Sequence, residues 1–166
     1  GLRDVRDRAI LLVAFAGAFR SAELLGLAGL RVYDCKRTTV GYELTVRRSK
    51  TDQEGAGFVK HISLGKPETC PVAALDAWLA WPGHKPEAPV FLGIPGDRPC
   101  SGKPLSRLDL LRILQRRAIR AGIDPAGLGQ IPCRSNVFVQ IWISRGKIIQ
   151  YCSVRIGELN FLECVE

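Results

Sequence analysis

An almost unbroken apolar run, Ala9 to Phe19, ends directly in an arginine, Arg20. The run has the character of a helix buried in a protein core, and Asp4 or Asp7 can cap its start. It is too short to span a bilayer, so we expect no association with a membrane. A buried arginine is costly unless it is paired. Arg20 is therefore either tied to a carboxylate, such as that of Glu23, or aimed at an anion.

The residues after this run predict a joint and then a small sheet. Ser21 is expected to cap a short second helix, Ala22 to Leu27, which leaves Arg20 in the joint between two helices. β-Branched and aromatic residues then predict three antiparallel strands, Leu30 to Tyr33, Tyr42 to Arg48 and Phe58 to Leu64. Lys50 falls in the loop between the last two strands.

The next predicted elements are two helices separated by a loop rich in glycine and proline. Pro71 opens a helix that runs to Leu79, and Val90 to Leu92 is a candidate short strand within the loop from Pro82 to Pro104. The second helix runs from Ser106 to Ala121, with Ser106 and Asp109 in capping-box spacing and Gly122 just past its end.

This last helix carries a stripe of arginines. Arg112, Arg116 and Arg120 recur every four residues, Arg117 lies beside them, and Arg107 lies in the first turn of the helix. No acid lies at i,i+4 to neutralise the stripe, so we expect it to repel itself in the absence of a polyanion and to follow DNA phosphates. The alternative is an ordinary solvated face.

Composition favours one basic domain. The chain has 166 residues, of which 46% are hydrophobic, and a formal net charge of +8. Residues 1–130 hold 20 Lys and Arg against 13 Asp and Glu, so the excess charge lies there, which favours a polyanionic partner. The six cysteines are widely spaced and accompanied by two histidines, a pattern that argues against a zinc site. We expect reduced, structural thiols and no metal or cofactor.

The composition changes after Gln130. Residues 1–130 contain 15 alanines and 6 isoleucines, whereas residues 131–166 contain no alanine, 6 isoleucines and three of the six cysteines. Asn136 to Ile143 and Lys147 to Ile156 predict strands. Either a different module begins at residue 131 or the reading frame was altered there. The absence of methionine leads us to expect that the chain is a fragment of a longer polypeptide.

Two motifs, Gly17 to Leu24 and Ser49-Lys50-Thr51, carry a resemblance to the tyrosine recombinases, the phage integrase family. The first resembles the family's first catalytic arginine motif, with one extra residue between glycine and Arg20, and the second resembles the hairpin turn of the catalytic lysine. The helices and strands of residues 1–129 also follow the family order. The resemblance implies an α+β fold: a mostly helical DNA breaking-rejoining catalytic domain with a small three-stranded antiparallel sheet. Residues 1–130 would form this domain, and residues 131–166 a divergent tail.

The sequence departs from the family where a His-x-x-Arg motif should follow. Ile131 stands in place of the histidine, three residues before Arg134, and no histidine occurs after His84. Tyr151 is the tyrosine of the tail, but it comes only 17 residues after Arg134, closer than the family spacing. We therefore expect the chain as it stands to lack turnover, although the resemblance implies an integrase ancestry.

The family's chemistry needs no metal. Two arginines clamp the phosphate with forked donors, a lysine protonates the leaving oxygen, and a tyrosine forms a 3′-phosphotyrosine link. The resemblance assigns catalytic roles to Arg20, Lys50, Arg134 and Tyr151. We expect contacts to DNA from Arg48 and from the five arginines Arg107, Arg112, Arg116, Arg117 and Arg120. It implies double-stranded DNA as partner, a tetramer on DNA, and a prokaryotic cytoplasmic location. The alternatives are a non-catalytic DNA-binding remnant of an integrase, and a basic domain whose partner is not DNA.

Overall fold

The computed structural model describes residues 1–47, 57–94, 103–122, 125, 137–144 and 147–155. Within these ranges the chain is mixed α+β, as the sequence predicts, with a three-stranded antiparallel sheet and a two-stranded one. The helices are α1 (Leu2–Ala16), α2 (Ser21–Leu24), α3 (Pro71–Leu79) and α4 (Arg107–Arg120), with 3-10 turns η1 (Val32–Asp34) and η2 (Pro67–Thr69). The strands are β1 (Cys35–Arg37), β2 (Gly41–Val46), β3 (Phe58–Ser63), β4 (Val137–Ser144) and β5 (Lys147–Arg155).

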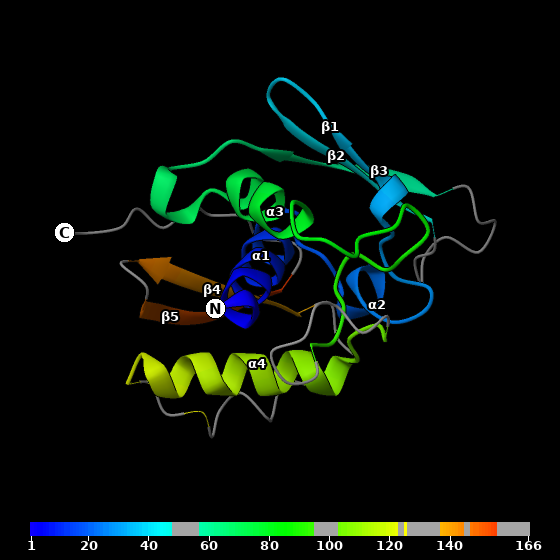
Figure 1. Ribbon diagram of the computed structural model, residues 1–166. Coiled ribbons are helices and arrows are strands. Elements are labelled where there is room, and N and C mark those ends of the chain that lie inside the picture. The colour runs from blue at the N-terminus through cyan, green and yellow to red at the C-terminus, as the bar shows by residue number, and fades with distance from the viewer. Residues whose placement is uncertain (48–56, 95–102, 123–124, 126–136, 145–146, 156–166) are drawn as a thin grey trace.

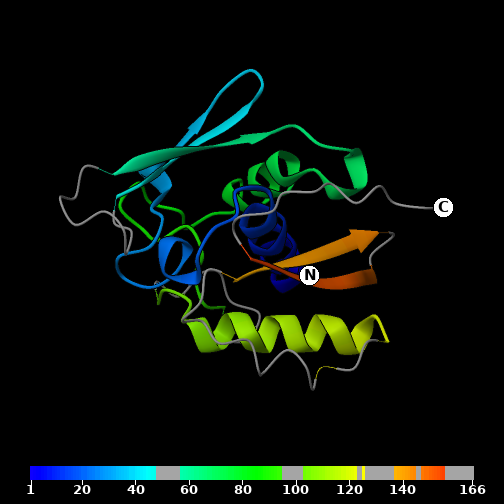
Figure 2. The same ribbon diagram turned by 180° about the vertical axis from the view of Figure 1, so that it is seen from behind.

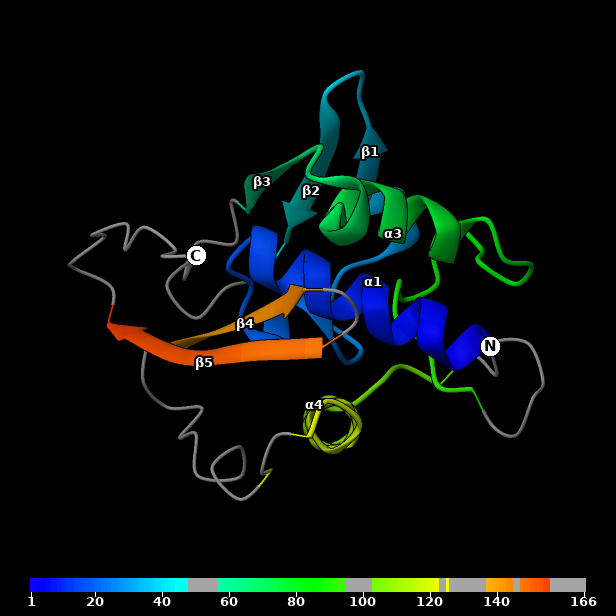
Figure 3. The same ribbon diagram turned by 90° about the vertical axis from the view of Figure 1, so that its left-hand side faces the viewer.

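Helix α1 is the central element of the fold. Helix α3 and the three-stranded sheet lie on one side of it, and α4 lies on the other (Figure 1). The hairpin of β4 and β5 lies between α1 and α4, which Figure 3 shows with α4 seen end-on. Seen from behind, the short α2 lies between the sheet and the nearer end of α4 (Figure 2). Both sides of α1 are thus covered, as its apolar sequence requires.

The C-terminal end of α1 is a tight turn that aims the chain toward α2. Gly17 donates its N–H to the Val13 carbonyl, and Ala18 takes a left-handed conformation with φ of 45°. Phe19 then folds back over Gly17, where an added Cβ would lie 2.2 Å from the Phe19 ring. Glycine at position 17 is therefore required by close packing, and this packing fixes the start of the segment that carries Arg20.

The three-stranded sheet has the order β1-β2-β3, but its first strand is not the predicted one. Residues 30–33 were expected to be a strand; instead Arg31 forms a single bridge with Pro89, and η1 follows. The reason is Asp34, whose carboxylate accepts the Arg31 backbone N–H at 3.1 Å and closes a turn. Strand β1 begins only after this turn. The other two strands are confirmed, each slightly shorter than predicted.

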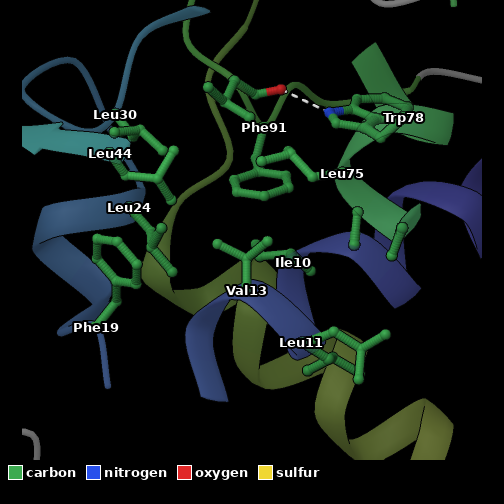
Figure 4. Packing of buried hydrophobic residues seen from close by; sticks show 14 of the residues in the cluster. Ile10, Leu11, Val13, Phe19, Leu24, Leu30, Leu44, Leu75, Trp78 and Phe91 are labelled. Atoms are coloured by element: carbon green, nitrogen blue, oxygen red, sulfur yellow. Dashed lines mark hydrogen bonds between the residues drawn. The ribbon is translucent and has the colours of Figure 1, made fainter. Parts of the chain in front are cut away.

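The core gathers around α1 and α3. Figure 4 shows Ile10 and Val13 of α1 facing Leu75 of α3 and Phe91, with the Trp78 indole beside them. The Trp78 Nε1–H donates to the Val90 carbonyl at 2.7 Å, so the one polar atom of this large side chain is satisfied. Residues 90–92 do not form the predicted strand, because they make only single backbone contacts, with Leu30 on one side and with Pro104 and Leu105 on the other.

Helices α3 and α4 begin where the sequence predicts. Pro71 is the first residue of α3, and the Cys70 sulfur accepts the Ala73 N–H at 3.4 Å. Ser106 and Asp109 form the predicted capping box of α4, and Gly122 follows it with φ of 74°. Residues adjacent in sequence therefore set where both helices begin.

The tail contains the two predicted strands. Strands β4 and β5 pair antiparallel, with a register shift between Trp142 and Ile143, and Tyr151 lies opposite Ile141. The prediction of β-structure after residue 136 is confirmed at the level of the backbone. The division of the chain into a domain of residues 1–130 and a tail of residues 131–166 stays a prediction.

Candidate functional site

Arg20 lies in the turn between α1 and α2 and is itself the residue that caps α2. Its backbone is extended, with φ of −72° and ψ of 148°, and its N–H donates to Glu23 Oε2 at 3.0 Å. The prediction that Ser21 caps this helix is wrong, because Ser21 is the first helical residue. The carboxylate of Glu23, three residues ahead, accepts the Arg20 amide, so the start of the helix does not need a side-chain oxygen at Ser21.

The Arg20 side chain is held by Glu23 yet remains accessible. Its Nη1 lies 3.5 Å from Glu23 Oε1, a long contact for an ion pair, and 33% of the side chain is exposed. The sequence left open whether this arginine is tied to a carboxylate or aimed at an anion. Arg20 is tied to a carboxylate, but only by a long contact, and the exposed part of its side chain can be reached by an anion.

Glu23 is the buried centre of this arrangement. The residue is 5% exposed, and its Oε2 accepts both the Arg20 backbone N–H and the ammonium of Lys60, the latter at 3.1 Å. Its backbone carbonyl accepts the Leu30 N–H at 3.0 Å. A buried carboxylate is stable only with such partners, so Lys60 and Arg20 together compensate its charge.

Lys60 is a member of the site that the sequence analysis missed. Its Nζ donates to the carbonyls of Gly17 and Ala18, each at 2.9 Å, as well as to Glu23. The same ammonium lies 4.4 Å from the centre of the Phe19 ring. Lys60 thus joins strand β3 to the turn that ends α1.

The strand pattern held the information needed to find Lys60. Phe58, Lys60 and Ile62 alternate along β3 and therefore share one face, and Ile62 is buried in the core. A lysine beside a buried isoleucine on the inward face needs a carboxylate or carbonyl partner. Local sequence gave no indication that the partner was Glu23, 37 residues earlier.

Ion pairs hold the β2–β3 hairpin to the rest of the fold near its loop end. Val46 pairs with Phe58 at this end, and the next residue, Arg47, pairs with buried Asp34 at 2.6 Å and lies over the Tyr33 ring at 4.7 Å. Lys60, two residues into β3, fastens the other strand to the Arg20 turn. Arg48 and Lys50 lie in the loop itself, outside the described residues.

The arginine stripe of α4 is less self-repelling than the sequence predicts, because part of its charge is compensated by another helix. Two aspartates of α1 pair with three of its members: Arg116 pairs with Asp7 at 3.2 Å, Arg117 with Asp4 and Asp7 at 2.7 and 3.2 Å, and Arg120 with Asp4 at 3.1 Å. These acids lie more than 100 residues away in sequence, so a search at i,i+4 could not find them. The stripe therefore also joins α4 to α1.

The beginning of α4 differs from its end. Arg107 is exposed and makes no ion pair with any residue that the structure describes, and Arg112 makes a long, exposed contact of 3.4 Å with Asp109. Arg112 and Arg116 line an open hollow of about 410 Å³ together with Arg3, Arg6 and Lys103. Positive charge thus gathers where α4 approaches the first turns of α1.

The two remaining predicted site residues belong to the tail. Arg134 lies outside the described residues, and Tyr151 is placed only by its backbone position on β5. Their relation to Arg20 stays a prediction.

The described residues form no metal site and no disulfide. Among the described residues no three His, Cys, Asp or Glu side chains come together as metal ligands. The Cys35 and Cys70 thiols are free, and burial, aided by the charge of Asp34, raises the pKa of Cys35 to about 12. None of the described helices is long and apolar enough to cross a membrane.

Comparison with known proteins gives one informative relative and no matching family model. The chain is 31% identical over 124 residues to a protein of Selenomonas ruminantium described as "Integrase/recombinase xerD homolog". The aligned region covers 74% of this chain and 35% of the relative, so the chain spans about a third of that protein's length. The similarity supports the resemblance to tyrosine recombinases that the motifs around Arg20 and Lys50 indicate.

Proposed function

We propose that this chain belongs to the tyrosine recombinases and forms the part of their catalytic domain that grips a DNA phosphate for site-specific recombination. The observation that carries the proposal is the turn at Arg20, where an accessible guanidinium is backed by buried Glu23. Lys60 attaches the β2–β3 hairpin to the same turn, and Lys50 lies in the loop of that hairpin. The similarity to the Selenomonas ruminantium protein supports the same function.

The proposed chemistry follows from these residue types. The planar guanidinium of Arg20 binds two non-bridging oxygens of a phosphodiester and stabilises the charge that develops on them. Lys50 donates a proton to the leaving 5′-oxygen, and Arg134 supplies a second guanidinium. Tyr151 is the candidate nucleophile: its phenolic oxygen attacks the phosphorus as the bond to the 5′-oxygen breaks, its proton passes to solvent water, and the 3′-phosphotyrosine link forms.

The chain as it stands is proposed to bind DNA without completing this reaction. Ile131 occupies the position of the histidine that would move protons, and an aliphatic side chain cannot do so. The spacing of 17 residues between Arg134 and Tyr151 also favours a non-catalytic, DNA-binding remnant. We propose that Arg48, Arg107 and Arg112 add contacts to the DNA backbone, and that Arg116, Arg117 and Arg120 contribute less because Asp4 and Asp7 engage them.

Binding and covalent capture test the proposal together. Anisotropy of a labelled 30-base-pair duplex should show binding that weakens steeply with salt, with a logarithmic slope of about −0.9 for each phosphate contact. Arg20→Ala should weaken binding about tenfold or more, and Arg20→Lys should recover it only partly because lysine lacks the fork. Lys36→Met, which removes an exposed cation, is the matched control.

A nicked duplex that traps the covalent intermediate distinguishes a non-catalytic DNA-binding remnant from an active recombinase. No denaturation-resistant adduct, with binding that depends on Arg20, supports the DNA-binding remnant. An adduct that disappears in Tyr151→Phe shows instead an active recombinase with Tyr151 as nucleophile. Salt-independent binding or none refutes both, and favours a basic domain with another partner.

The change of composition at residue 131 suggests a test at the level of the gene. We propose that residues 131–166 form a tail distinct from the catalytic domain of residues 1–130, produced by an altered reading frame. Sequencing of the DNA from the Leu128 codon should then reveal His-x-x-Arg and a downstream tyrosine in another frame. If sequencing confirms the present reading frame and no other frame encodes those motifs, the proposal of an altered reading frame is refuted.

The partner, the cellular location and the oligomeric state that we propose follow from the proposed activity. The partner is double-stranded DNA in the cytoplasm of a prokaryotic cell, and recombination of two duplexes calls for a tetramer assembled on DNA. Analytical ultracentrifugation with and without duplex measures that assembly. A particle that stays monomeric on saturating DNA contradicts the tetramer while leaving the phosphate site intact.

A further inference from the structure

We propose that Lys60 is a positioning residue for the phosphate site: by neutralising Glu23, it keeps the Arg20 guanidinium available to an anion instead of to the carboxylate. This inference rests on the proposed function, since it concerns the same site. Lys60 lies 40 residues beyond Arg20, on β3, and neither the sequence motifs nor the similar protein assigns it a role.

The contacts of Lys60 exclude a direct role in binding phosphate. Its ammonium has three N–H donors, and three acceptors surround it, namely the Gly17 and Ala18 carbonyls and Glu23 Oε2. The side chain is only 18% exposed, and the Phe19 ring lies 4.4 Å away. Lys60 therefore acts through the groups it holds and not through a ligand.

The charge balance at Glu23 affects how strongly this carboxylate holds the Arg20 guanidinium. Lys60 and Arg20 are the cations that contact this carboxylate in the described part of the chain, at 3.1 and 3.5 Å. The shorter contact belongs to Lys60, so most of the compensation comes from it. If Lys60 lost its charge, the buried carboxylate would draw the Arg20 guanidinium closer, because an uncompensated buried charge is strongly unfavourable.

Lys60→Met tests this inference with little change of shape. Methionine keeps the unbranched apolar stem beside Phe19 and removes the ammonium. We expect DNA affinity to fall about tenfold, and the salt slope to become shallower by about 0.9, because Arg20 would no longer contact a phosphate. Lys36→Met is the matched control, since Lys36 also pairs with a glutamate across a strand, Glu43 at 3.0 Å, but is 74% exposed. It should change affinity less than twofold.

Glu23→Gln distinguishes positioning from a merely structural role. Glutamine keeps an oxygen that can accept the Arg20 backbone N–H but has no charge with which to capture the guanidinium. Combined with Lys60→Met, it should restore affinity to within about threefold of the parent chain. If Lys60 only holds the fold together, the double variant will bind no better than Lys60→Met, and that result refutes the inference.

The stability of each variant and the DNA affinity of Arg20→Ala are measured in the same experiment as controls. Thermal unfolding of each variant sets a temperature at which all are folded, and affinities are compared there. If Lys60→Met does not fold, Glu23→Gln alone decides: binding equal to or tighter than the parent supports the inference, and a tenfold loss refutes it. If Arg20→Ala leaves binding unchanged, the proposed function fails. If Arg20→Ala weakens binding and Lys60→Met does not, only the role of Lys60 is refuted.

Discussion

Replacing Asp7 by asparagine should destabilise the protein more than any exposed charge change. Asp7 is 1% exposed, and its carboxylate accepts four hydrogen bonds: two from Arg6, at 2.7 and 3.1 Å, and one each from Arg116 and Arg117, both at 3.2 Å. Asparagine fits the space but carries no charge, and its amide nitrogen cannot accept. The substitution would leave Arg6 buried without its counter-ion.

The expected magnitude follows from the burial of this pair. Removing one partner of a buried ion pair costs about 3–5 kcal/mol. Arg116 and Arg117 are partly exposed and can turn to water, so we expect the lower end, about 3 kcal/mol. For a chain of this length, that loss lowers the midpoint of thermal unfolding by roughly 6–12 °C.

Urea unfolding followed by circular dichroism measures this loss, with Glu43→Gln as a control. Glu43 makes an exposed pair with Lys36, so its replacement should leave the unfolding midpoint nearly unchanged. Arg6→Met in the Asp7→Asn background should recover part of the loss, because the uncompensated buried cation is gone. A loss below about 1 kcal/mol for Asp7→Asn, or an additive double variant, would falsify the argument.

Three further predictions concern other parts of the chain. Gly17→Ala should cost about 1–3 kcal/mol in urea unfolding, because the new Cβ meets the Phe19 ring at 2.2 Å; an unchanged midpoint contradicts that packing. Arg112→Gln should make the salt slope of DNA binding shallower by about 0.9 without loss of stability, whereas an unchanged slope removes Arg112 from the DNA contacts. The Ser106 hydroxyl, its backbone amide and Arg112 hold the pKa of Asp109 below the ordinary 3.8, so this carboxylate stabilises α4 at neutral pH and stops doing so as the pH falls through the acid range. Asp109→Asn should therefore lower stability at pH 7 and flatten the acid part of the pH profile, and equal losses at pH 7 and pH 2 contradict this.

The sequence predicts those elements whose boundaries are set by neighbouring residues. Pro71 fixes the start of α3, and the Ser106–Asp109 box with Gly122 fixes both ends of α4. The strands β2 and β3 follow from their β-branched and aromatic residues. Such local features act within one or two turns, so they are visible without knowledge of the fold.

The predicted secondary structure is wrong where a hydrogen bond to a side chain outweighs the strand or capping propensity of neighbouring residues. Val32 and Tyr33 favour a strand, but the Asp34 carboxylate bonds to the Arg31 amide and closes a 3-10 turn. At α2, the carboxylate of Glu23 made a serine cap unnecessary. In both cases an acid three residues ahead determined the backbone.

The candidate site was only partly predictable for a different reason. Arg20 was identified because an arginine that ends an apolar run is unusual in itself. Lys60 and the pairing of the α4 arginines depend on contacts across 37 to 116 residues of chain. Charge compensation at such separations is a property of the tertiary structure, and spacing rules within one helix do not contain it.

The ion pairs between α1 and α4 also bear on how the chain is made. Roughly 100 residues must be synthesised between the two helices, which takes about 5–20 s at ordinary translation rates. During that interval α1, whose buried face is apolar, has emerged while the helix whose arginines pair with Asp7 does not yet exist. We expect a ribosome-bound nascent chain to expose this surface to chaperones and proteases until residue 120 has left the exit tunnel.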